Sequence, residues 1–507
     1  MTSQTVLFAG CTPEVAAGAD GRILAVGAKA RAAAGRAAEV VRLRGTAWPG
    51  LFDAHLHLEG LADRNLYLGL AGVKSLEAAM ELVQRWSSKL PKDAWVLGAG
   101  WYNDLWPDPA FPTRKHLDQA GGGRPVYLRR KDGHSVWVSS AALRLAGIDR
   151  NTEDPPGGLI DHDELGEPTG ILRETAEDLI ERLVPAPTDD VLDQAMTRAL
   201  ASLARFGLTS VQSMDGSVGF RSLQRLHSRG RLPIRVTYNL PVADLPHAER
   251  IGVRSGWGDD RLRIWGVKAF LDGSLGSRTA EMLDGSGTSR LPQSDLVEII
   301  RRCAKAELNV CLHAIGDAAV RRALDALMPH RRAWKKWRPR LEHAQCVDPK
   351  DWKRFAQSGT IASMQPIHAV SDRELADRYW PSVARNSYAW GALERAGAVL
   401  AFGSDAPVET ADPLAGMAAA TTWRRIARWH PELAVSQASA LRAYTSNAAY
   451  AVGQEDDLGA LKPGMLCDLT VVDEGEVTAT VVGGKVSFSR KPRATSRRSG
   501  AGARSRP

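Results

Sequence analysis

Residues 49–60 read PGLFDAHLHLEG, a short apolar run in which one leucine separates two histidines, His55 and His57. Successive side chains of a strand point to opposite faces, so the two imidazoles would share one face and converge. Such a pair could bind a metal, but an isolated H-x-H is more often one exposed histidine and one histidine satisfied in the core. Further ligands at the ends of other strands would decide in favour of a metal site.

The sequence on either side alternates short β-rich runs with helical patterns. Helical periodicity at 189–207 and 294–308, for example, separates runs that are rich in strand-forming residues. Strand, helix and strand in succession predict a parallel sheet, and eight such strands close a TIM barrel. We therefore predict an α/β fold built on a TIM (β/α)8 barrel. Its strands are expected at 47–57, 208–214, 234–240, 262–273, 308–314, 338–344, 360–366 and 398–408.

Several parts of the chain do not fit the barrel, which we place at 47–454. Residues 1–46 and 455–488 contain short strand-like runs, and we expect them to form one small composite β-domain from both chain ends. Residues from about 66 to 190 are too many for a loop between a strand and a helix. We expect an insertion over the barrel mouth, where barrel enzymes build their active sites. Residues 489–507 are basic and poor in apolar side chains, which predicts a disordered tail.

Composition and charge limit the classes of protein to which this chain can belong. The 507 residues are 44% hydrophobic and 24% charged, and no apolar run approaches the roughly 20 residues of a membrane span. No secretory signal opens the chain, so we expect a soluble cytoplasmic protein. The net charge is +8, but the stretch from Arg490 to the end holds seven Arg or Lys and no acid. The folded part is thus nearly neutral, which predicts neither a specific nucleic-acid partner nor a membrane partner; a homodimer is the assembly we expect.

Candidate metal ligands stand at the ends of the predicted strands. The five cysteines are scattered and lack C-x-x-C spacing, which argues against a thiolate zinc site and a disulfide framework and favours buried thiols. Histidine, lysine and aspartate side chains occur instead, and each alone could be a core histidine, a surface lysine or a capping acid. Their joint position at the end of the barrel that carries the chemistry predicts a divalent-metal site. Its six members are His55, His57, Lys268, His313, His343 and Asp405.

These motifs carry a family resemblance. The series PGLFDAHLHLEG, GVKAFLDGSLGSRTA, CLHAIGDAAV, RLEHAQ and FGSDAPVE, closed by LGALKPGMLCDLTVVD, resembles the amidohydrolase superfamily. It is most similar to the YtcJ-like group, amidohydrolase family 3, whose members include N-substituted formamide deformylase. The resemblance runs from about residue 5 to residue 486. It implies a distorted (β/α)8 barrel with a small β-sandwich formed from both chain ends.

The resemblance also implies how the six residues share the metals. One divalent ion would be held by His55, His57 and Asp405, and a second by His313 and His343. A carboxylated Lys268 would bridge the two ions, and burial would favour the neutral amine from which the carbamate forms. Two Zn²⁺ ions are expected, although iron, manganese or cobalt would also suit these ligands. If Lys268 remains an ammonium, it would repel a second cation, and the site would hold one metal or none.

A reaction follows from the same resemblance. The expected function is hydrolysis of a carbon–nitrogen bond, of amide or N-formyl type, in a small-molecule substrate by a metal-activated hydroxide. A bound metal lowers the pKa of water from 15.7 toward about 7. Asp405 would take the water proton and pass it to the leaving atom, and His134 in DGHSVW would donate to the developing oxyanion.

Other residues of the matching motifs are weaker candidates. Trp101 and Trp106 could wall an apolar pocket or only pack the insertion. Ser139 in WVSSAAL departs from the family pattern, where an asparagine is expected. Three charged residues could orient ligands from behind or form structural ion pairs, namely Asp272, Arg278 and Asp317.

Two alternatives remain open at this point. A deaminase of the same superfamily would attack a ring amidine, but it would carry a glutamate a few residues after the fifth-strand histidine, where this chain has HAIGDAA. A non-catalytic barrel protein would keep the fold for binding, but such relatives lose ligands, and here all six positions are filled.

Overall fold

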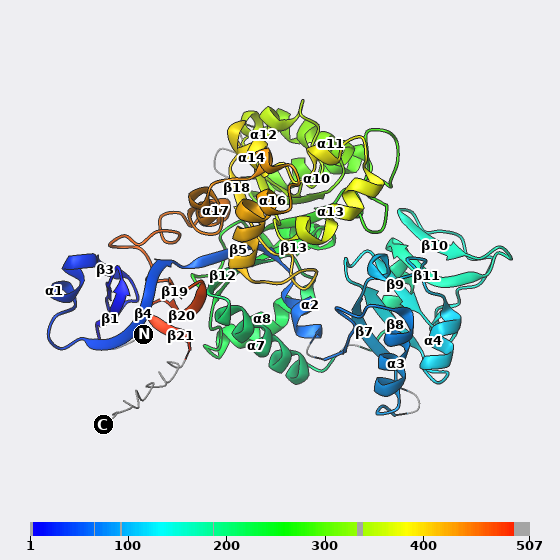
Figure 1. The fold of residues 1–507 in the computed structure, drawn as a ribbon, viewed down its shortest axis with the longest axis horizontal. Helices are drawn as coiled ribbons and strands as arrows, with labels where there is room; N and C mark the ends of the chain where they lie inside the picture. Colours follow the sequence, from blue (N-terminus) through cyan, green and yellow to red (C-terminus); the bar gives the residue numbers. More distant parts are fainter. Residues whose placement is uncertain (1–3, 65, 92–93, 186, 332–337, 491–507) are drawn as a thin grey trace, which may run out of the picture.

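The structure is a computed structural model that describes residues 4–64, 66–91, 94–185, 187–331 and 338–490. Three sheets organise these residues, and in Figure 1 they succeed one another from left to right as the chain-end sheet, the barrel and the insertion. Most of the tail that we predict to be disordered, 489–507, lies outside the described residues. Of that tail, Ser489 ends strand β21 and Arg490 pairs with Glu476.

The central sheet has eight strands in parallel pairs, in the order β18-β17-β16-β15-β14-β13-β12-β5. Its strands are almost wholly buried on both faces, as expected when helices surround a parallel sheet. Their bounds are β5 Leu51–Leu56, β12 Leu208–Ser213, β13 Arg235–Pro241, β14 Leu262–Phe270, β15 Asn309–Ala314, β16 Arg340–His343, β17 Ile361–Met364 and β18 Leu400–Phe402. The predicted distorted TIM barrel is confirmed.

The barrel closes where its first and last strands meet. The backbone N–H of Asp405 donates to the carbonyl of His55 at 2.7 Å, and the N–H of His57 donates to the carbonyl of Ala406 at the same distance. Gly403 lies at this contact, and a Cβ there would stand 2.4 Å from the backbone nitrogen of His55. Only glycine therefore lets the two strands approach so closely.

Helices cover the outside of the barrel, and the longer ones turn an apolar face to the strands. In α7, Asp189–Arg205, the inward side chains include Leu192, Met196, Leu200 and Leu203. The others are α8 Ser217–Ser228, α9 Leu245–Ile251, α10 Gln293–Ala306, α11 Asp317–Leu327, α12 Trp352–Ser358, α13 His368–Tyr379, α14 Trp390–Arg395, α15 Pro413–Ala418, α16 Arg424–Ile426, α17 Gln437–Ala443 and α18 Ser446–Ala451.

Strands from both chain ends share one seven-stranded sheet, in the order β21-β20-β19-β4-β1-β2-β3. Antiparallel pairing of β4 with β19 joins the two ends, and the short helix α1, Ala30–Ala34, packs against β2 and β3. The strands are β1 Val6–Thr12, β2 Val15–Ala17, β3 Ile23–Val26, β4 Glu39–Pro49, β19 Leu469–Asp473, β20 Glu476–Val482 and β21 Lys485–Ser489. Strand β4 crosses the domain boundary that we predict at residue 46, so the strand expected at 47–57 is in fact the end of β4 followed by β5.

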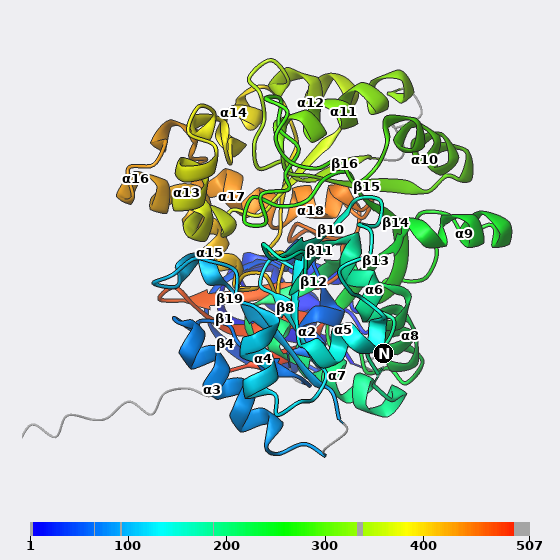
Figure 2. The same cartoon turned by 90° about the vertical axis from the view of Figure 1, so that its right-hand side faces the viewer.

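The insertion is a third unit with its own sheet and core. Its six strands lie in the order β10-β11-β9-β8-β7-β6, and Figure 2 shows its helices in front of them. The strands are β6 Leu68–Gly69, β7 Val96–Trp101, β8 Val126–Arg130, β9 Ser135–Val138, β10 Gly158–His162 and β11 Pro168–Glu174. The helices are α2 Leu58–Asp63, which leads out of the barrel, then α3 Leu76–Ser87, α4 Arg114–Ala120, α5 Ser140–Ala146 and α6 Asp178–Glu181.

The segment DGSLGSRTA, 272–280, fastens the insertion to the barrel. The hydroxyls of Ser274 and Ser277 donate to Asp132 at 3.1 and 3.0 Å, and the hydroxyl of Thr279 donates to Glu174 at 2.5 Å. Asp132 and Glu174 both belong to the insertion, so this motif holds the two units in register.

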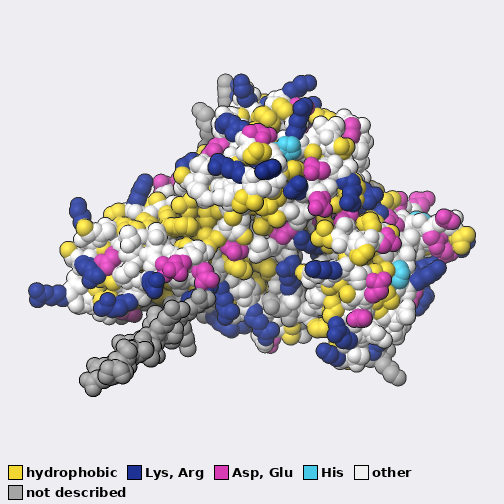
Figure 3. Space-filling view, viewed as in Figure 1, with side chains coloured by type: hydrophobic (Ala, Val, Ile, Leu, Met, Phe, Trp, Pro, Cys, Tyr) yellow, Lys and Arg dark blue, Asp and Glu magenta, His cyan; other side chains and the backbone are white. Residues whose placement is uncertain are grey.

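Surface and thiol features agree with the composition. Acidic and basic side chains are interspersed over the face in Figure 3. All five cysteines are free and buried, as predicted. Among the described helices, none combines the length and the apolar character that a membrane crossing requires.

Candidate metal centre

The structure brings the six predicted metal ligands to the barrel mouth. His55, Lys268 and His313 project from β5, β14 and β15, and His343 ends β16. His57 follows β5 directly, and Asp405 lies three residues beyond β18. The rings of neighbouring imidazoles stand close together, with centroids 4.5 Å apart for His313 and His343 and 4.7 Å apart for His55 and His343.

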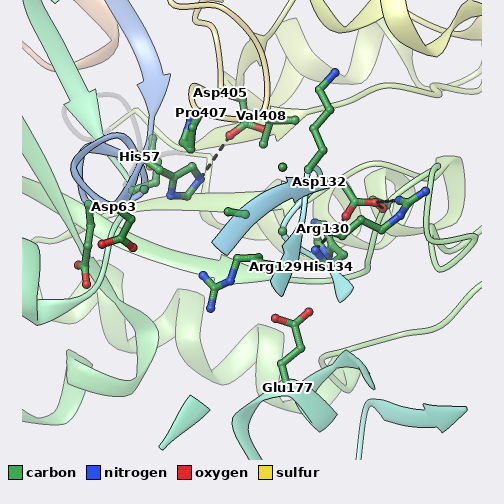
Figure 4. Close-up of a pocket in the computed structure, with 18 of the residues that line it drawn as sticks. His57, Asp63, Arg129, Arg130, Asp132, His134, Glu177, Asp405, Pro407 and Val408 are labelled. Carbon is green, nitrogen blue, oxygen red and sulfur yellow. Dashed lines mark hydrogen bonds and ion pairs between the residues drawn. The ribbon is translucent and has the colours of Figure 1, made fainter. Parts of the chain in front are cut away.

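Asp405 lies at the middle of the cluster. Its Oδ1 is 3.3 Å from Nε2 of His55 and 3.3 Å from Nε2 of His57, a contact drawn in Figure 4, and its Oδ2 is 3.9 Å from Nδ1 of His343. Donor atoms of His55, His343 and Asp405 all lie within 4.8 Å of one another, and the three residues are buried. These three residues could therefore hold one ion, a grouping that differs from the one the resemblance implies, in which His343 belongs with His313.

Each of the four imidazoles has one ring nitrogen near an oxygen acceptor outside the cluster. Nδ1 of His55 is 2.7 Å from Glu342, and Nδ1 of His343 is 2.9 Å from Oε1 of Gln365. Nε2 of His313 is 3.0 Å from the carbonyl of Gly273, and Nδ1 of His57 is 3.3 Å from Asp215. Because these oxygens only accept, the facing nitrogens carry protons, and in each neutral imidazole the other nitrogen has a lone pair.

Two buried atoms of the cluster lack hydrogen bonds among the described residues, and both suit a cation. They are Nδ1 of His313 and Oδ1 of Asp405. Buried polar atoms are nearly always satisfied, so such atoms indicate a group that the protein expects to bind. A lone-pair nitrogen and a carboxylate oxygen are donors that a borderline divalent metal prefers. The residues present therefore fit a divalent metal.

The backbone explains how consecutive residues can face the same interior. Residues that alternate along β16 would place Glu342 and His343 on opposite faces. His343, however, has φ 72°, and Asp405 has φ 58°, both in the left-handed region that non-glycine residues rarely adopt. Strained backbone of this kind occurs at functional sites, and here it turns both side chains toward the cluster.

Lys268 lies inside the cluster rather than on the surface. Its side chain is buried, Nζ is 3.5 Å from Nε2 of His55, and the ring of Phe270 stands 4.8 Å away. Burial lowers the pKa of Lys268, which favours the neutral amine.

Electrostatics hold the surrounding acids ionised. Burial alone would raise the pKa of Glu342, but Arg340 and His55 lower it well below its ordinary value. Burial would likewise raise the pKa of Asp405, and contacts with His55 and His57 lower it instead. For His57 burial would lower the pKa, but Asp215 and Asp405 outweigh burial and raise it to about 9. A metal at His57 would therefore displace a proton.

His134 reaches the cluster from the insertion. Its ring is 5.3 Å from that of His313, and its Nδ1 lies 3.0 Å from Oε2 of Glu174. Arg290 also contacts Glu174 at 3.0 Å. Burial would lower the pKa of His134, but Glu174 outweighs this effect and raises it. A protonated imidazole in this position can donate a hydrogen bond into the cavity.

Sequence patterns missed three residues that touch the cluster, namely Asp215, Glu342 and His368. His368 lies at the start of α13, with Nε2 3.5 Å from Oδ2 of Asp405. The sequence did contain an indication, because His368 stands four residues after β17, much as Asp405 stands three residues after β18.

The weaker candidates lie around the cluster or away from it. Trp101 and Trp106 are buried in the core of the insertion and do not line the cavity. Arg278 is exposed and donates to the hydroxyl of Tyr379 at 2.9 Å. The carboxylate of Asp272 accepts from backbone N–H groups at 315, 316 and 281, and that of Asp317 accepts from Leu283. Ser139 caps α5 and accepts from Val126, so its hydrogen bonding is complete without an asparagine.

A single cavity of about 680 Å³ lies over the cluster, between the barrel mouth and the insertion. Its walls include five of the six ligands, together with His134 and His368. Figure 4 shows His57 and Asp405 on one side of this space and Arg129 and Glu177 on the other. The volume is that of a site for a small molecule.

Comparison with known proteins agrees with the geometry. The sequence profile of the Amidohydrolase family matches residues 40–488. YtcJ of Bacillus subtilis strain 168 is 31% identical over 485 residues, which cover 89% of this chain and 91% of YtcJ. N-substituted formamide deformylase of Arthrobacter pascens is 27% identical, over 90% of this chain and 89% of its own.

Among solved structures, an uncharacterised metal-dependent hydrolase from Pyrococcus furiosus is similar with a TM-score of 0.71 and 29% identity. The match covers 93% of this chain and 99% of that chain. The predicted family resemblance is confirmed, and the family implies a divalent metal and a small-molecule substrate. The chain belongs to the amidohydrolase family and is a hydrolase that acts on carbon–nitrogen bonds.

Proposed function

We propose that this chain hydrolyses an amide or N-formyl bond of a small molecule at the barrel mouth. The arrangement of the four imidazoles is the observation that carries the proposal. Each has one ring nitrogen occupied by an acceptor outside the cluster, which leaves the other nitrogen for a metal. Similarity to an N-substituted formamide deformylase adds N-formyl amines to the candidate substrates.

Two divalent ions, with zinc as the expected metal, account for all six donors. One would be held by His55, His57 and Asp405, and the other by His313 and His343. Lys268 would bridge them after its neutral amine joins carbon dioxide and releases a proton, and burial of this amine favours that reaction. When bound, the metals supply Lewis acidity, which lowers the pKa of a coordinated water toward about 7 and polarises the substrate carbonyl.

The protein's own side chains move the protons and stabilise the charge. Asp405, ionised and buried, accepts a proton from the attacking water and delivers it to the amide nitrogen. The carbon–nitrogen bond then breaks, so that an amine leaves and the acyl group becomes a carboxylic acid, which releases the remaining proton of the water to solvent and ends as a carboxylate. His134, held by Glu174, donates to the carbonyl oxygen as that oxygen becomes negative.

Deamination of a ring amidine is the second candidate, and the geometry gives it less support. That reaction would need a proton-carrying acid just after His313. The acid in that stretch is Asp317, whose carboxylate is engaged with the N–H of Leu283 at 2.8 Å. A second metal bridged by Lys268 would also be superfluous in a site of that kind.

Metal content tests the proposal. The wild type and Lys268→Ala would be purified with bicarbonate and zinc, beside Lys305→Ala, which removes an exposed lysine of α10. We expect about two metals per chain in the wild type and the control, and one or none in Lys268→Ala. Added short-chain carboxylates should restore metal and activity to Lys268→Ala, because they can replace the carbamate oxygens.

One metal in all three proteins would remove Lys268 from the site, contradict the bridged pair and favour deamination. Two metals with no hydrolysis across a panel of N-acyl and N-formyl amines would leave the metal centre intact but contradict the proposed reaction.

A further inference from the structure

The cavity extends from the metal centre to a group of carboxylates between the barrel and the insertion. We call Glu59, Asp63, Glu177 and Glu181 the acidic patch, and all four line the cavity. Asp63 ends α2, which leads out of the first barrel strand, whereas Glu177 follows β11 of the insertion. Figure 4 shows Asp63 and Glu177 at the edges of the same space, with Arg129 between them.

Arg129 is shared among these acids and Arg290 also acts on Glu177, but both cations already have carboxylate partners. Arg129, from β8, donates to Glu181 at 2.7 Å and to the hydroxyl of Tyr127 at 3.0 Å. Neither Asp63 nor Glu177 has an ion pair of its own within the described residues. Carboxylates therefore exceed cations at this end of the cavity.

Among the acids of the patch, Glu177 gives the clearest indication of a missing partner. The residue is 6% exposed, and its Oε1 is buried without a hydrogen-bond partner in the part of the chain that the structure describes. Burial raises the pKa of Glu177 well above its ordinary value, so the carboxyl is protonated in the absence of a cation, and a cation that enters would favour its ionised form. An unpartnered buried carboxyl is costly to the fold, and a donor that enters the cavity would satisfy it.

The lining of the cavity is apolar in part. Leu192, Met214 and Val218 line it from the barrel side, and Leu97 and Val184 line it from the insertion. A guest in the cavity thus meets the metal centre, apolar side chains and carboxyl groups.

We propose that the acidic patch binds a cationic group of the substrate, an ammonium or a guanidinium, with Glu177 as the residue that determines specificity. The substrate class is then an N-acyl or N-formyl amine that carries a positive charge beyond an apolar spacer. The kind of bond that is cleaved rests on the proposed function, whereas binding of a positive charge by the acidic patch does not.

Matched probes test the inference on the metal-loaded full chain. The cationic probes are N-(ω-aminoalkyl)formamides of increasing chain length, and each neutral partner has a methyl group in place of the ammonium. Calorimetry gives Kd for both members of a pair, and kcat/KM is measured where they are hydrolysed. We expect the wild type to favour the cationic member of the best pair by about tenfold or more.

Glu177→Gln should remove most of this preference, because glutamine keeps the size of the side chain and cannot ionise when a cation enters. Asp63→Asn should also reduce the preference for the cationic probe. This variant takes the place of Glu177→Gln in the test if Glu177→Gln does not fold. The control is Glu164→Gln, an exposed acid of the β10–β11 turn, which should keep the preference of the wild type.

Equal affinity of the wild type for cationic and neutral probes would overturn the inference. So would failure of the cationic probes to bind at about 10 mM, or a preference that survives both substitutions. Selective binding of the cation without hydrolysis would instead support the inference and contradict the proposed reaction.

Discussion

The cavity has two walls of different origin, and they hold their polar groups in different ways. On the barrel wall the imidazoles project from strands or strand ends and are each fixed by an acceptor behind them. On the insertion wall the charged groups are mostly bound to one another, as in the pair of Arg129 with Glu181 at 2.7 Å, and Glu177 is left over. Rigid strands suit groups that must meet a metal within a fraction of an ångström, whereas an appended unit can vary without disturbing them. The barrel wall should therefore determine the reaction, and the insertion wall the substrate.

Asp405→Asn should have the largest effect. An amide cannot accept the water proton, so we expect kcat to fall by about 10³-fold with the best N-formyl amine of the panel. Steady-state kinetics with metal analysis on the same preparation would separate lost proton transfer from lost metal. A fall of less than about tenfold would assign the proton transfer to another group near the cluster, with His368 the first to examine.

His134→Asn tests whether the two walls are truly separate. Removal of a donor to the oxyanion should lower kcat by about 10²-fold, while the metal content stays at the wild-type level because His134 belongs to the insertion wall. A loss of metal in this variant would break the comparison, since His134 would then be a ligand.

A substitution outside both walls should change stability alone. Asp193 of α7 accepts from Ser222 and Arg225 of α8 at 2.7 Å, and the residue is buried. Burial would raise its pKa, but Arg225 and Ser222 lower it. Asp193→Asn should therefore cost roughly 2 kcal/mol of unfolding free energy at pH 7, with kcat/KM unchanged.

The sign of the pH dependence follows from that lowered pKa. A depressed carboxyl contributes stability above its unfolded pKa of about 3.9, and the contribution is lost as the pH falls through the folded pKa. The unfolding free energies of the wild type and Asp193→Asn, measured with denaturant, should thus become equal as the pH is lowered. Asp190→Asn, an exposed acid of the same helix, is the control. A difference that persists at low pH would exclude the ion pair as its cause.

The barrel wall could be predicted from the sequence because its ligands follow a repeated rule. His55, His313 and His343 each stand near the end of a buried parallel strand, and parallel strands bring such ends together. Glu342 escaped prediction because regular alternation points it away from His343, and a single left-handed residue reverses that expectation. Local periodicity contains no information about such a residue.

The insertion wall could not be predicted, because its residues meet only through the packing of two units. Glu177 and Asp63 are far apart in sequence, one in the turn after β11 and the other at the end of α2, and no spacing rule joins them. Trp101 and Trp106 illustrate the same limit, since an aromatic side chain of the insertion can face a pocket or a core, and here both face the core.

Pairing of β4 with β19 has a consequence for how the chain is made. A ribosome releases the first four strands of the end sheet long before the last three, so β4 waits with an unpaired edge until synthesis is nearly complete. The same delay governs the barrel, because His55 cannot meet Asp405 until β18 has emerged. Nascent chains thus carry the histidines of the centre well before its carboxylate, and loss of β19 would leave β4 open to association with other chains.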